Sequence, residues 1–170
     1  MAQRIGDRGT SSEPILRLAR PDDIPTIESL LAAEWLPPMM IAEFLPTFWV
    51  LEEGGRVVGG AGLEVYGREG VLRSVVVDPS LRGTGQGHRL AETALAEAKR
   101  QKVRRVYLFT MTAMPFFARY GFRPCTMEEF EPSVRESWQY RGLSERPEIL
   151  SRMTPMRLEL AECPSGGRSS

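Results

Sequence analysis

The feature that most constrains this chain is a glycine-rich segment, R-G-T-G-Q-G at residues 82–87, which lies between an apolar run and a helix-like run. The apolar run, residues 71–77, has the composition of a strand. After the glycines, apolar residues recur at helical spacing through Gln101, and another strand-like run covers residues 103–110. Strand, helix and strand in this order predict two parallel strands, with the helix packed on one face of their sheet.

The glycine-rich segment is chemically suited to binding an anion. Glycines let the backbone approach a ligand closely, and a helix start favours phosphate through its unpaired N–H donors and its dipole. Neither a P-loop nor a dinucleotide fold is indicated, because no Lys-Ser or Lys-Thr follows the last glycine and repeated strand–helix units are missing. An ordinary turn is the alternative. We predict a pyrophosphate site made by Arg82, Gly83, Thr84, Gly85, Gln86 and Gly87.

The rest of the chain alternates between short strand-like and helix-like runs. Residues 48–52, 56–66 and 71–77 are strand-like and are joined by tight turns, which predicts an antiparallel meander. Residues 123–152 show no clear pattern. The other expected elements are a first strand at 15–19, a helix from Ile24, a short helix at 115–120 and a last strand at 153–160.

The composition narrows the class of partner. Lys plus Arg and Asp plus Glu both number 22, so no net positive field attracts nucleic acid or an anionic membrane. A small molecule or a protein is the expected partner. One histidine and two cysteines are too few for a metal cluster or a disulfide framework, so we expect no metal cofactor and a cytoplasmic location.

The length of 170 residues suits one domain. We expect this domain over residues 14–160, with flexible tails at 1–13 and 161–170 because both ends are poor in apolar residues. The start of the chain does not read as a signal peptide, and no apolar run approaches the ~20 residues that span a bilayer. A monomer and a homodimer are both compatible with the sequence.

Two motifs resemble one family. V-V-V-D-P-S-L-R-G-T-G-Q-G, residues 75–87, looks like the acyl-CoA motif of the GNAT superfamily, and F-F-A-R-Y-G-F, residues 116–122, is similar to that superfamily's late helix. The resemblance covers a third of the chain. It implies an α/β fold with a mixed, largely antiparallel twisted sheet flanked by helices, and a splayed central pair of parallel strands. It also implies acetyl-CoA as co-substrate, with its pantetheine arm on the backbone of Val75, Val76 and Val77.

The chemistry that the resemblance implies is attack of an amine on the thioester, which needs a proton acceptor, a proton donor and groups that stabilise the oxyanion. Many members of the superfamily use a tyrosine as the acid, but that position here is Phe117. Tyr120 is therefore the candidate acid. Glu64 is the candidate base, directly or through water, with pairing to a neighbouring strand or exposure to solvent as the alternatives. His88 is expected to face solvent or phosphate.

A longer segment indicates the acceptor. Y-L-F-T-M-T-A-M-P-F-F-A-R-Y-G-F, residues 107–122, resembles N-acetylglutamate-synthase-type domains and the N-acetyltransferases of arsenic-resistance clusters, and G-L-E-V-Y-G, residues 62–67, resembles the latter. The resemblance implies a small amino-acid acceptor, glutamate or an arsenic- or phosphorus-containing analogue. The candidate acceptor-binding residues are Arg73, Ser74, Thr110 and Thr112. An ion pair with Glu64 is the alternative role for Arg73, because a buried arginine needs an anionic partner.

Two other functions remain open. A sensor that binds acyl-CoA without turnover is favoured by Phe117, which lacks an acidic proton. A protein N-acetyltransferase would need an open acceptor groove, and the sequence does not reveal how residues 35–45 and 123–152 close that side. We expect Trp35, Met39 and Met40 to cover the acceptor side, with packing in the core as the alternative.

Overall fold

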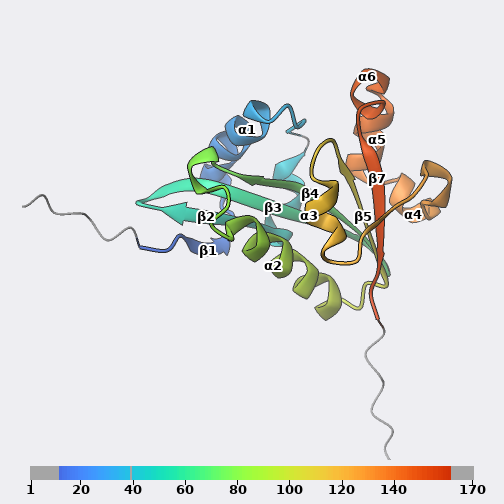
Figure 1. Ribbon diagram of the computed structural model, residues 1–170, viewed down its shortest axis with the longest axis horizontal. Helices are drawn as coiled ribbons and strands as arrows, with labels where there is room; N and C mark the ends of the chain where they lie inside the picture. Colours follow the sequence, from blue (N-terminus) through green and yellow to red (C-terminus); the bar gives the residue numbers. More distant parts are fainter. Residues whose placement is uncertain (1–11, 39, 162–170) are drawn as a thin grey trace, which may run out of the picture.

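The protein folds around one mixed sheet. The computed structural model describes residues 12–38 and 40–161, and within them seven strands pair in the order β1-β2-β3-β4-β5-β7-β6 (Figure 1). The strands are β1 (Ile15–Leu18), β2 (Phe48–Glu53), β3 (Arg56–Tyr66), β4 (Glu69–Val77), β5 (Arg105–Thr110), β6 (Arg123–Pro124) and β7 (Thr154–Glu159).

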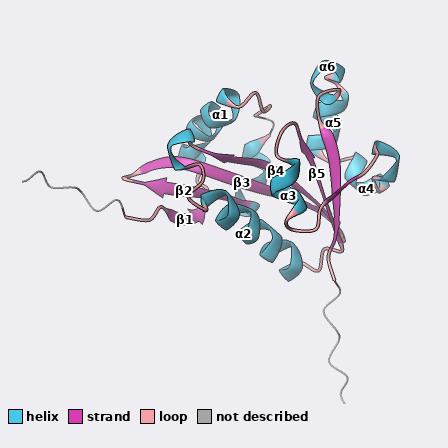
Figure 2. Ribbon diagram, viewed as in Figure 1, coloured by secondary structure: helices cyan, strands magenta, loops and turns pink. Residues whose placement is uncertain are grey.

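Helices flank the sheet (Figure 2). The α-helices are α1 (Ile24–Ala33), α2 (Gln86–Arg100), α3 (Met114–Ala118), α4 (Pro132–Arg135), α5 (Trp138–Ser144) and α6 (Pro147–Leu150). The 3₁₀ helices are η1 (Pro21–Asp23), η2 (Ile41–Thr47), η3 (Pro79–Leu81) and η4 (Met127–Glu129).

The predicted topology is confirmed. β2, β3 and β4 pair antiparallel in turn, as the predicted meander required, and β1 pairs antiparallel with the outer edge of β2. β4 and β5 are parallel and are joined through α2. Along the described chain, their register covers only Glu69–Arg105, Gly70–Val106 and Val71–Tyr107. Beyond these pairs the two strands separate toward their carboxyl ends, which is the predicted splay.

A β-bulge interrupts β4 just after the last pair with β5. Gly60 lies opposite Val76 and Gly62 lies opposite Arg73, so one residue of β3 faces both Ser74 and Val75. Ser74 has a φ of 57°, in the left-handed region that non-glycine residues seldom occupy. A bulge bends its strand and changes the direction of its side chains. The sequence does not predict this bulge, because Ser74 is not a glycine or asparagine.

The core lies on both faces of the sheet, because alternate residues of a strand point to opposite sides. Trp49 and Leu51 of β2 pack on the α2 side, with Leu90 and Ala94 of that helix. Phe48 and Val50 pack on the α1 side. Ile27 and Leu31 of α1 are buried there, and Ile24 and Leu30 pack at its edge, so the helix expected from Ile24 is confirmed and packs through these apolar residues.

The segment without a clear sequence pattern forms the end of the molecule beside β5 and β7. It contains β6, η4 and the helices α4, α5 and α6, which have four, seven and four residues (Figure 1). Each is too short for a helical repeat of apolar residues to become visible. A third cluster of buried residues joins this segment to the sheet through Val71, Tyr107, Phe130 and Val134.

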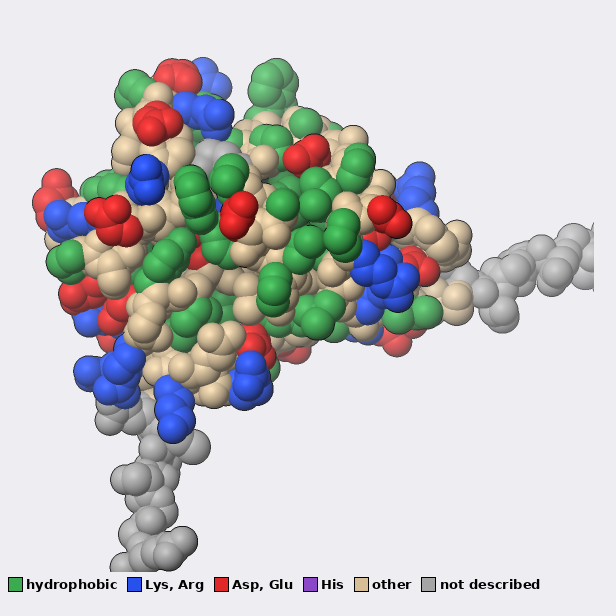
Figure 3. All heavy atoms as spheres, turned by 180° about the vertical axis from the view of Figure 1, so that it is seen from behind, with side chains coloured by type: hydrophobic (Ala, Val, Ile, Leu, Met, Phe, Trp, Pro, Cys, Tyr) green, Lys and Arg blue, Asp and Glu red, His purple; other side chains and the backbone are tan. Residues whose placement is uncertain are grey.

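The surface carries mixed charge, as the balanced composition predicts. Figure 3 shows the side opposite the view of Figure 1, where apolar side chains gather in the middle of the face and acidic and basic side chains are interspersed. In the described ranges, none of the helices combines the length and the apolar character that crossing a membrane requires. Met39 and most residues of the two expected tails lie outside the described residues.

Candidate active site

A cavity of about 410 Å³ occupies the space where β4 and β5 separate. Residues 73–77 of β4 form one wall, and residues 108–113, at the end of β5 and in the turn after it, form the other. The opening that the resemblance implied is therefore a real cavity. Its third side is formed by Phe116 and Phe117 of α3.

The wall formed by β4 is mainly backbone and apolar side chains. Val75, Val76 and Val77 line the cavity. On the cavity side, β5 does not pair with residues 75–77 of β4. The backbone N–H and C=O groups of residues 75–77 on that side therefore face the opening instead of a strand within the described chain. Backbone groups left in this way can bind an extended ligand as a further strand. This arrangement fits the pantetheine arm of acetyl-CoA.

The glycine-rich loop connects this wall to α2. Gly83 and Gly85 have φ angles of 76° and 88°, conformations that glycine adopts without strain. Gly85 is the N-cap of α2, so the N–H groups of the first helical turn follow it directly. Gly87 lines the cavity. The loop therefore leads into the first turn of α2 beside the cavity, and its binding of a pyrophosphate stays a prediction.

The polar side chains of the loop mostly hold the loop itself. The Thr84 hydroxyl donates to the Leu81 carbonyl oxygen over 2.5 Å. Gln86 is buried, and its side-chain oxygen accepts a hydrogen bond from Arg89 over 2.9 Å. Among the six predicted residues, these two side chains hold the loop, which leaves the backbone and the Arg82 guanidinium as the groups suited to contact a ligand.

Arg82 of the glycine-rich loop lines the cavity. Its guanidinium forms an ion pair with Glu34, the residue that ends α1, and both residues line the cavity. Among the described lining residues, Glu34 carries the only carboxylate. A phosphate at the loop would compete with Glu34 for this guanidinium. No local pattern links Glu34 to Arg82, because the two residues are 48 positions apart in the chain.

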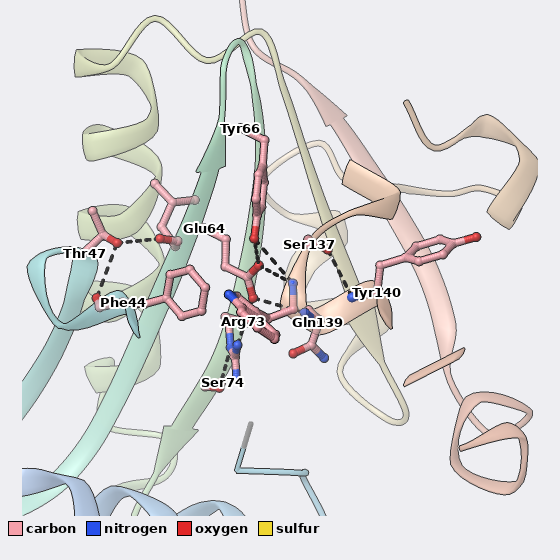
Figure 4. A network of polar contacts seen from close by, with 11 residues as sticks. Phe44, Thr47, Glu64, Tyr66, Arg73, Ser74, Ser137, Gln139 and Tyr140 are labelled. Atoms are coloured by element: carbon pink, nitrogen blue, oxygen red, sulfur yellow. Dashed lines mark hydrogen bonds and ion pairs between the residues drawn. The ribbon is translucent and has the colours of Figure 1, made fainter. Parts of the chain in front are cut away.

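A buried ion pair lies behind the cavity (Figure 4). The Arg73 guanidinium donates to the Glu64 carboxylate over 2.8 Å, and both side chains have no solvent exposure. The Arg73 guanidinium also packs over the Phe44 ring, 5.4 Å from its centroid. Burial lowers the pKa of Arg73, and the Glu64 carboxylate acts against that shift. The ion pair that the sequence left as one alternative for Arg73 is confirmed.

Glu64 also accepts three further hydrogen bonds. The Tyr66 hydroxyl donates over 2.5 Å, and the backbone N–H groups of Trp138 and Gln139 donate over 3.1 and 3.2 Å. Burial and the hydrogen bond to Glu64 raise the pKa of Tyr66. Glu64 is not among the described residues that line the cavity. Its role as the base therefore stays a prediction, and its carboxylate serves four donors of the protein.

The candidate acceptor residues come together at the cavity. Arg73, Ser74, Thr110 and Thr112 all line it. Ser74 Oγ accepts a hydrogen bond from Arg73 Nε over 3.3 Å. Thr110 Oγ1 accepts from the Ala113 N–H over 3.0 Å and keeps its own hydrogen for donation. Contact of these four residues with an acceptor stays a prediction.

The candidate acid lies on another side of α3. The Tyr120 hydroxyl lies 2.5 Å from His88 Nδ1, and the His88 ring packs on Phe116 with 4.7 Å between centroids. Burial raises the pKa of Tyr120, and Glu92 adds to that shift. Tyr120 is absent from the described lining of the cavity, whereas Phe117 is part of it. The role of Tyr120 as acid stays untested, and the position of its hydroxyl outside the described lining argues against it.

Several lining residues were not identified from the sequence. Leu36 and Pro37 line the cavity, as do Gln139 and Met153 from the segment without a clear pattern. The only local signal near Gln139 is Ser137, which caps α5 by accepting a hydrogen bond from the Tyr140 N–H.

The loop after α1 is only partly as expected. Core packing was the alternative for its large apolar residues, and it is wrong for Trp35, which is 83% exposed, and for Met40, which is also exposed. The turn that ends α1 gives Trp35 a left-handed backbone, and its side chain faces solvent. Across the described residues, no three His, Cys, Asp or Glu side chains gather as a metal site requires.

Comparison with known proteins gives the following likenesses. Residues 14–122 match the model of the acetyltransferase (GNAT) family. An amino-acid acetyltransferase of Mycobacterium tuberculosis is 33% identical over 144 residues, which are 76% of this chain and 82% of that protein. A crystal structure of an M. tuberculosis protein in complex with CoA has a TM-score of 0.70 at 30% identity, over 87% of this chain and 100% of that one.

N-acetylglutamate synthase from Neisseria gonorrhoeae, complexed with coenzyme A and N-acetyl-glutamate, also has a TM-score of 0.70, at 21% identity. The likeness covers 87% of this chain and 35% of the synthase chain, and at this identity it concerns the fold alone.

Proposed function

This chain belongs to the GNAT acetyltransferase family and is an acetyl-CoA-dependent N-acetyltransferase, and from that premise we propose that its acceptor is the amino group of a small amino acid. The proposed class is glutamate or an arsenic- or phosphorus-containing analogue of it. The observation that carries the proposal is the cavity between β4 and β5, which joins an anion loop at one end to a group of polar side chains at the other.

The co-substrate supplies an acetyl group activated as a thioester, whose carbonyl carbon accepts the amine. The loop at residues 82–87 holds the pyrophosphate, with Arg82 transferring from Glu34 to phosphate oxygens. The backbone of Val75, Val76 and Val77 holds the pantetheine arm and presents N–H donors toward the oxyanion. The apolar Phe117 ring excludes water from this end of the cavity.

The acceptor occupies the part of the cavity beyond the thioester. Leu36 and Pro37 limit it on one side, and Gln139 and Met153 limit it on the other. These boundaries suit a small molecule better than the extended segment of a protein substrate. The M. tuberculosis relative, which is matched over 82% of its length, is an amino-acid acetyltransferase, and this supports the same acceptor class here.

A thiol-release assay tests the proposal. Purified protein is incubated with acetyl-CoA and a panel of amino acids that includes glutamate, phosphinothricin and trivalent arsinothricin. We expect CoA release that depends on the acceptor, and no release when the amine is already acetylated. A panel that yields no thiol above background contradicts the proposal.

The same assay distinguishes the enzyme from a sensor that binds acyl-CoA without turnover. Phe117 in the cavity wall is the observation that favours it, because a phenyl ring donates no proton to a leaving thiolate. Tight binding of acetyl-CoA in calorimetry, combined with no thiol release under any acceptor, is the result expected of a sensor.

A further inference from the structure

The start of α5 is fixed by the buried ion pair. Ser137 has no solvent exposure, and its Oγ caps the helix by accepting from the Tyr140 N–H over 3.1 Å. The next two N–H groups, of Trp138 and Gln139, donate to Glu64. Because Glu64 also holds Arg73, the first turn of α5 is tied to β3 and β4 at the wall of the cavity.

The side chain of Gln139 leaves this anchored turn and enters the cavity wall. In Figure 4 it extends beside Arg73 and away from the Glu64 carboxylate. Gln139 is 8% exposed and lines the cavity. Among the described residues, its backbone N–H bonds to Glu64, but no protein group bonds to its carboxamide. In the described chain the carboxamide atoms are not among the buried side-chain atoms that lack a partner, so they are open to the cavity, where they can bond to a ligand.

The position of Gln139 along the cavity indicates which ligand it meets. Arg73 and Val77 lie four residues apart on β4, which corresponds to roughly 13 Å of strand. The glycine-rich loop follows the Val77 end, whereas Gln139 is linked through Glu64 to the Arg73 end. Gln139 therefore faces the part of the cavity beyond the pantetheine arm, where the acceptor is held.

We propose that Gln139 is a specificity-determining residue, whose carboxamide hydrogen-bonds the polar end of the acceptor's side chain. The inference rests on the proposed function. A carboxamide offers two N–H donors and one acceptor oxygen, so it suits a head group that carries oxygen, such as a carboxylate, a carboxamide or a phosphinate. An acceptor with an apolar side chain leaves this amide unpaired and is selected against.

Acceptor selectivity in the variant Gln139→Leu tests this inference. Leucine keeps a similar size and removes the donors and the acceptor. The assay compares kcat/KM for glutamate, glutamine and phosphinothricin with kcat/KM for norvaline, which has the same α-amino and α-carboxyl groups but no polar head. We expect the preference for the best polar acceptor over norvaline to fall by about tenfold, with norvaline itself changed less than about threefold.

Four results overturn the inference. A parallel loss for all acceptors assigns Gln139 to the shared amino-acid groups or to the fold, and an unchanged preference removes it from recognition. A wild-type protein that acetylates norvaline as well as the polar acceptors also contradicts it, while the proposed function stands. If no amino acid is acetylated, the proposed function itself fails, and this inference fails with it.

Two further variants keep the test sharp. Gln139→Glu preserves the size of the side chain, so it is informative even if Gln139→Leu does not fold. It replaces the N–H donors by a negative charge, and we expect kcat/KM to fall at least about tenfold more for glutamate than for glutamine. An equal effect on the two acceptors counts against contact with the head group. Gln101→Leu, the same change at the end of α2, serves as the control.

Discussion

Phe117 and Tyr120 are three positions apart on the chain, yet only one of them lines the cavity. Phe117 faces the space between β4 and β5, and the Tyr120 hydroxyl bonds to His88 on α2. The helix α3 ends at Ala118, so Tyr120 follows it in a turn rather than on its cavity face. Tyr120 carries the hydroxyl nearest to Phe117 in the sequence, but the hydroxyls in the described lining of the cavity belong to Ser74, Thr110 and Thr112.

The change Tyr120→Phe measures what that hydroxyl contributes. We expect kcat to fall by less than about threefold, because removal of a working general acid costs about 10²-fold or more and this hydroxyl lies outside the cavity lining. Steady-state kinetics over a range of pH is the measurement. A fall of about 10²-fold together with loss of the basic limb of the pH profile would establish Tyr120 as the acid.

The buried ion pair of Arg73 and Glu64 leads to a prediction about stability. Arg73→Met leaves the Glu64 carboxylate buried without its cationic partner, and we expect the free energy of unfolding to fall by about 3–5 kcal/mol. Adding Glu64→Gln removes the buried charge and recovers at least half of the loss. Urea denaturation of the two variants and the wild type measures this. A double variant no more stable than Arg73→Met contradicts the coupling.

Among the loops that connect the elements, the glycine-rich loop and the β2–β3 turn share a left-handed glycine conformation but have different roles. Gly85 has a φ of 88° at the start of α2, and Gly55 has a φ of 76° in the turn between two strands. A Cβ atom at either position meets no atom within 4 Å, so a side chain strains the backbone at both sites without a steric clash.

This match gives a controlled prediction. We expect Gly85→Val to weaken acetyl-CoA binding by at least about tenfold, because valine disfavours the left-handed conformation that aims the loop N–H groups at a phosphate. Gly55→Val strains the fold to a similar extent but leaves the affinity unchanged. Titration calorimetry with acetyl-CoA compares the two. Equal affinities would remove the loop from the cofactor site.

A polar network joins β1, β2 and the start of α1. Arg17 binds Asp23 and Glu52 over 2.7 Å each, with all three side chains mostly buried. The hydrogen bond from Arg17 is the main reason that the pKa of Asp23 is lowered, and burial opposes it. A lowered pKa in the folded state stabilises the protein above the unfolded pKa, and this stabilisation is lost as the pH falls through the folded value.

The variant Arg17→Met tests this network. We expect the free energy of unfolding to fall by about 1–3 kcal/mol at neutral pH, because Asp23 and Glu52 lose a charged donor. The difference from wild type should shrink as the pH falls through the acidic range and the Asp23 carboxyl becomes protonated, because the hydrogen bond from Arg17 is the main cause of the lowered pKa of Asp23. Denaturation across this range measures it. Arg56→Met is the control, because Arg56 is 68% exposed and its pair with Asp78 is worth little.

At the scale of the whole molecule, the sequence predicted most of what is repetitive and little of what is brought together from a distance. The meander, α2 and β5 have runs long enough for their periodicity to be read, and the glycines of the loop reveal their backbone conformation directly. The cavity was implied by resemblance to a family, and the splay of β4 and β5 confirms the fold on which it depends.

The acceptor side was less predictable for a physical reason. Gln139 reaches the cavity on a seven-residue helix whose start is held by Glu64, 75 residues earlier in the chain. Neither residue has a neighbour in sequence that signals the other. Glu34 and Arg82 meet in the same way, across 48 residues. Such contacts between distant residues form only in the complete fold, so a short stretch of sequence does not reveal them.

The short stretch of parallel pairing between β4 and β5 leaves the sheet incomplete in the absence of a ligand. In the part of the chain that the structure describes, the two halves of the sheet share a register of three residue pairs, and beyond these pairs the edges of β4 and β5 face the cavity. If the pantetheine arm lies along that edge, the backbone hydrogen bonds that β5 does not make to β4 are made by a small molecule instead of by the protein chain. Each catalytic cycle then extends the sheet when acetyl-CoA binds and shortens it again when CoA leaves.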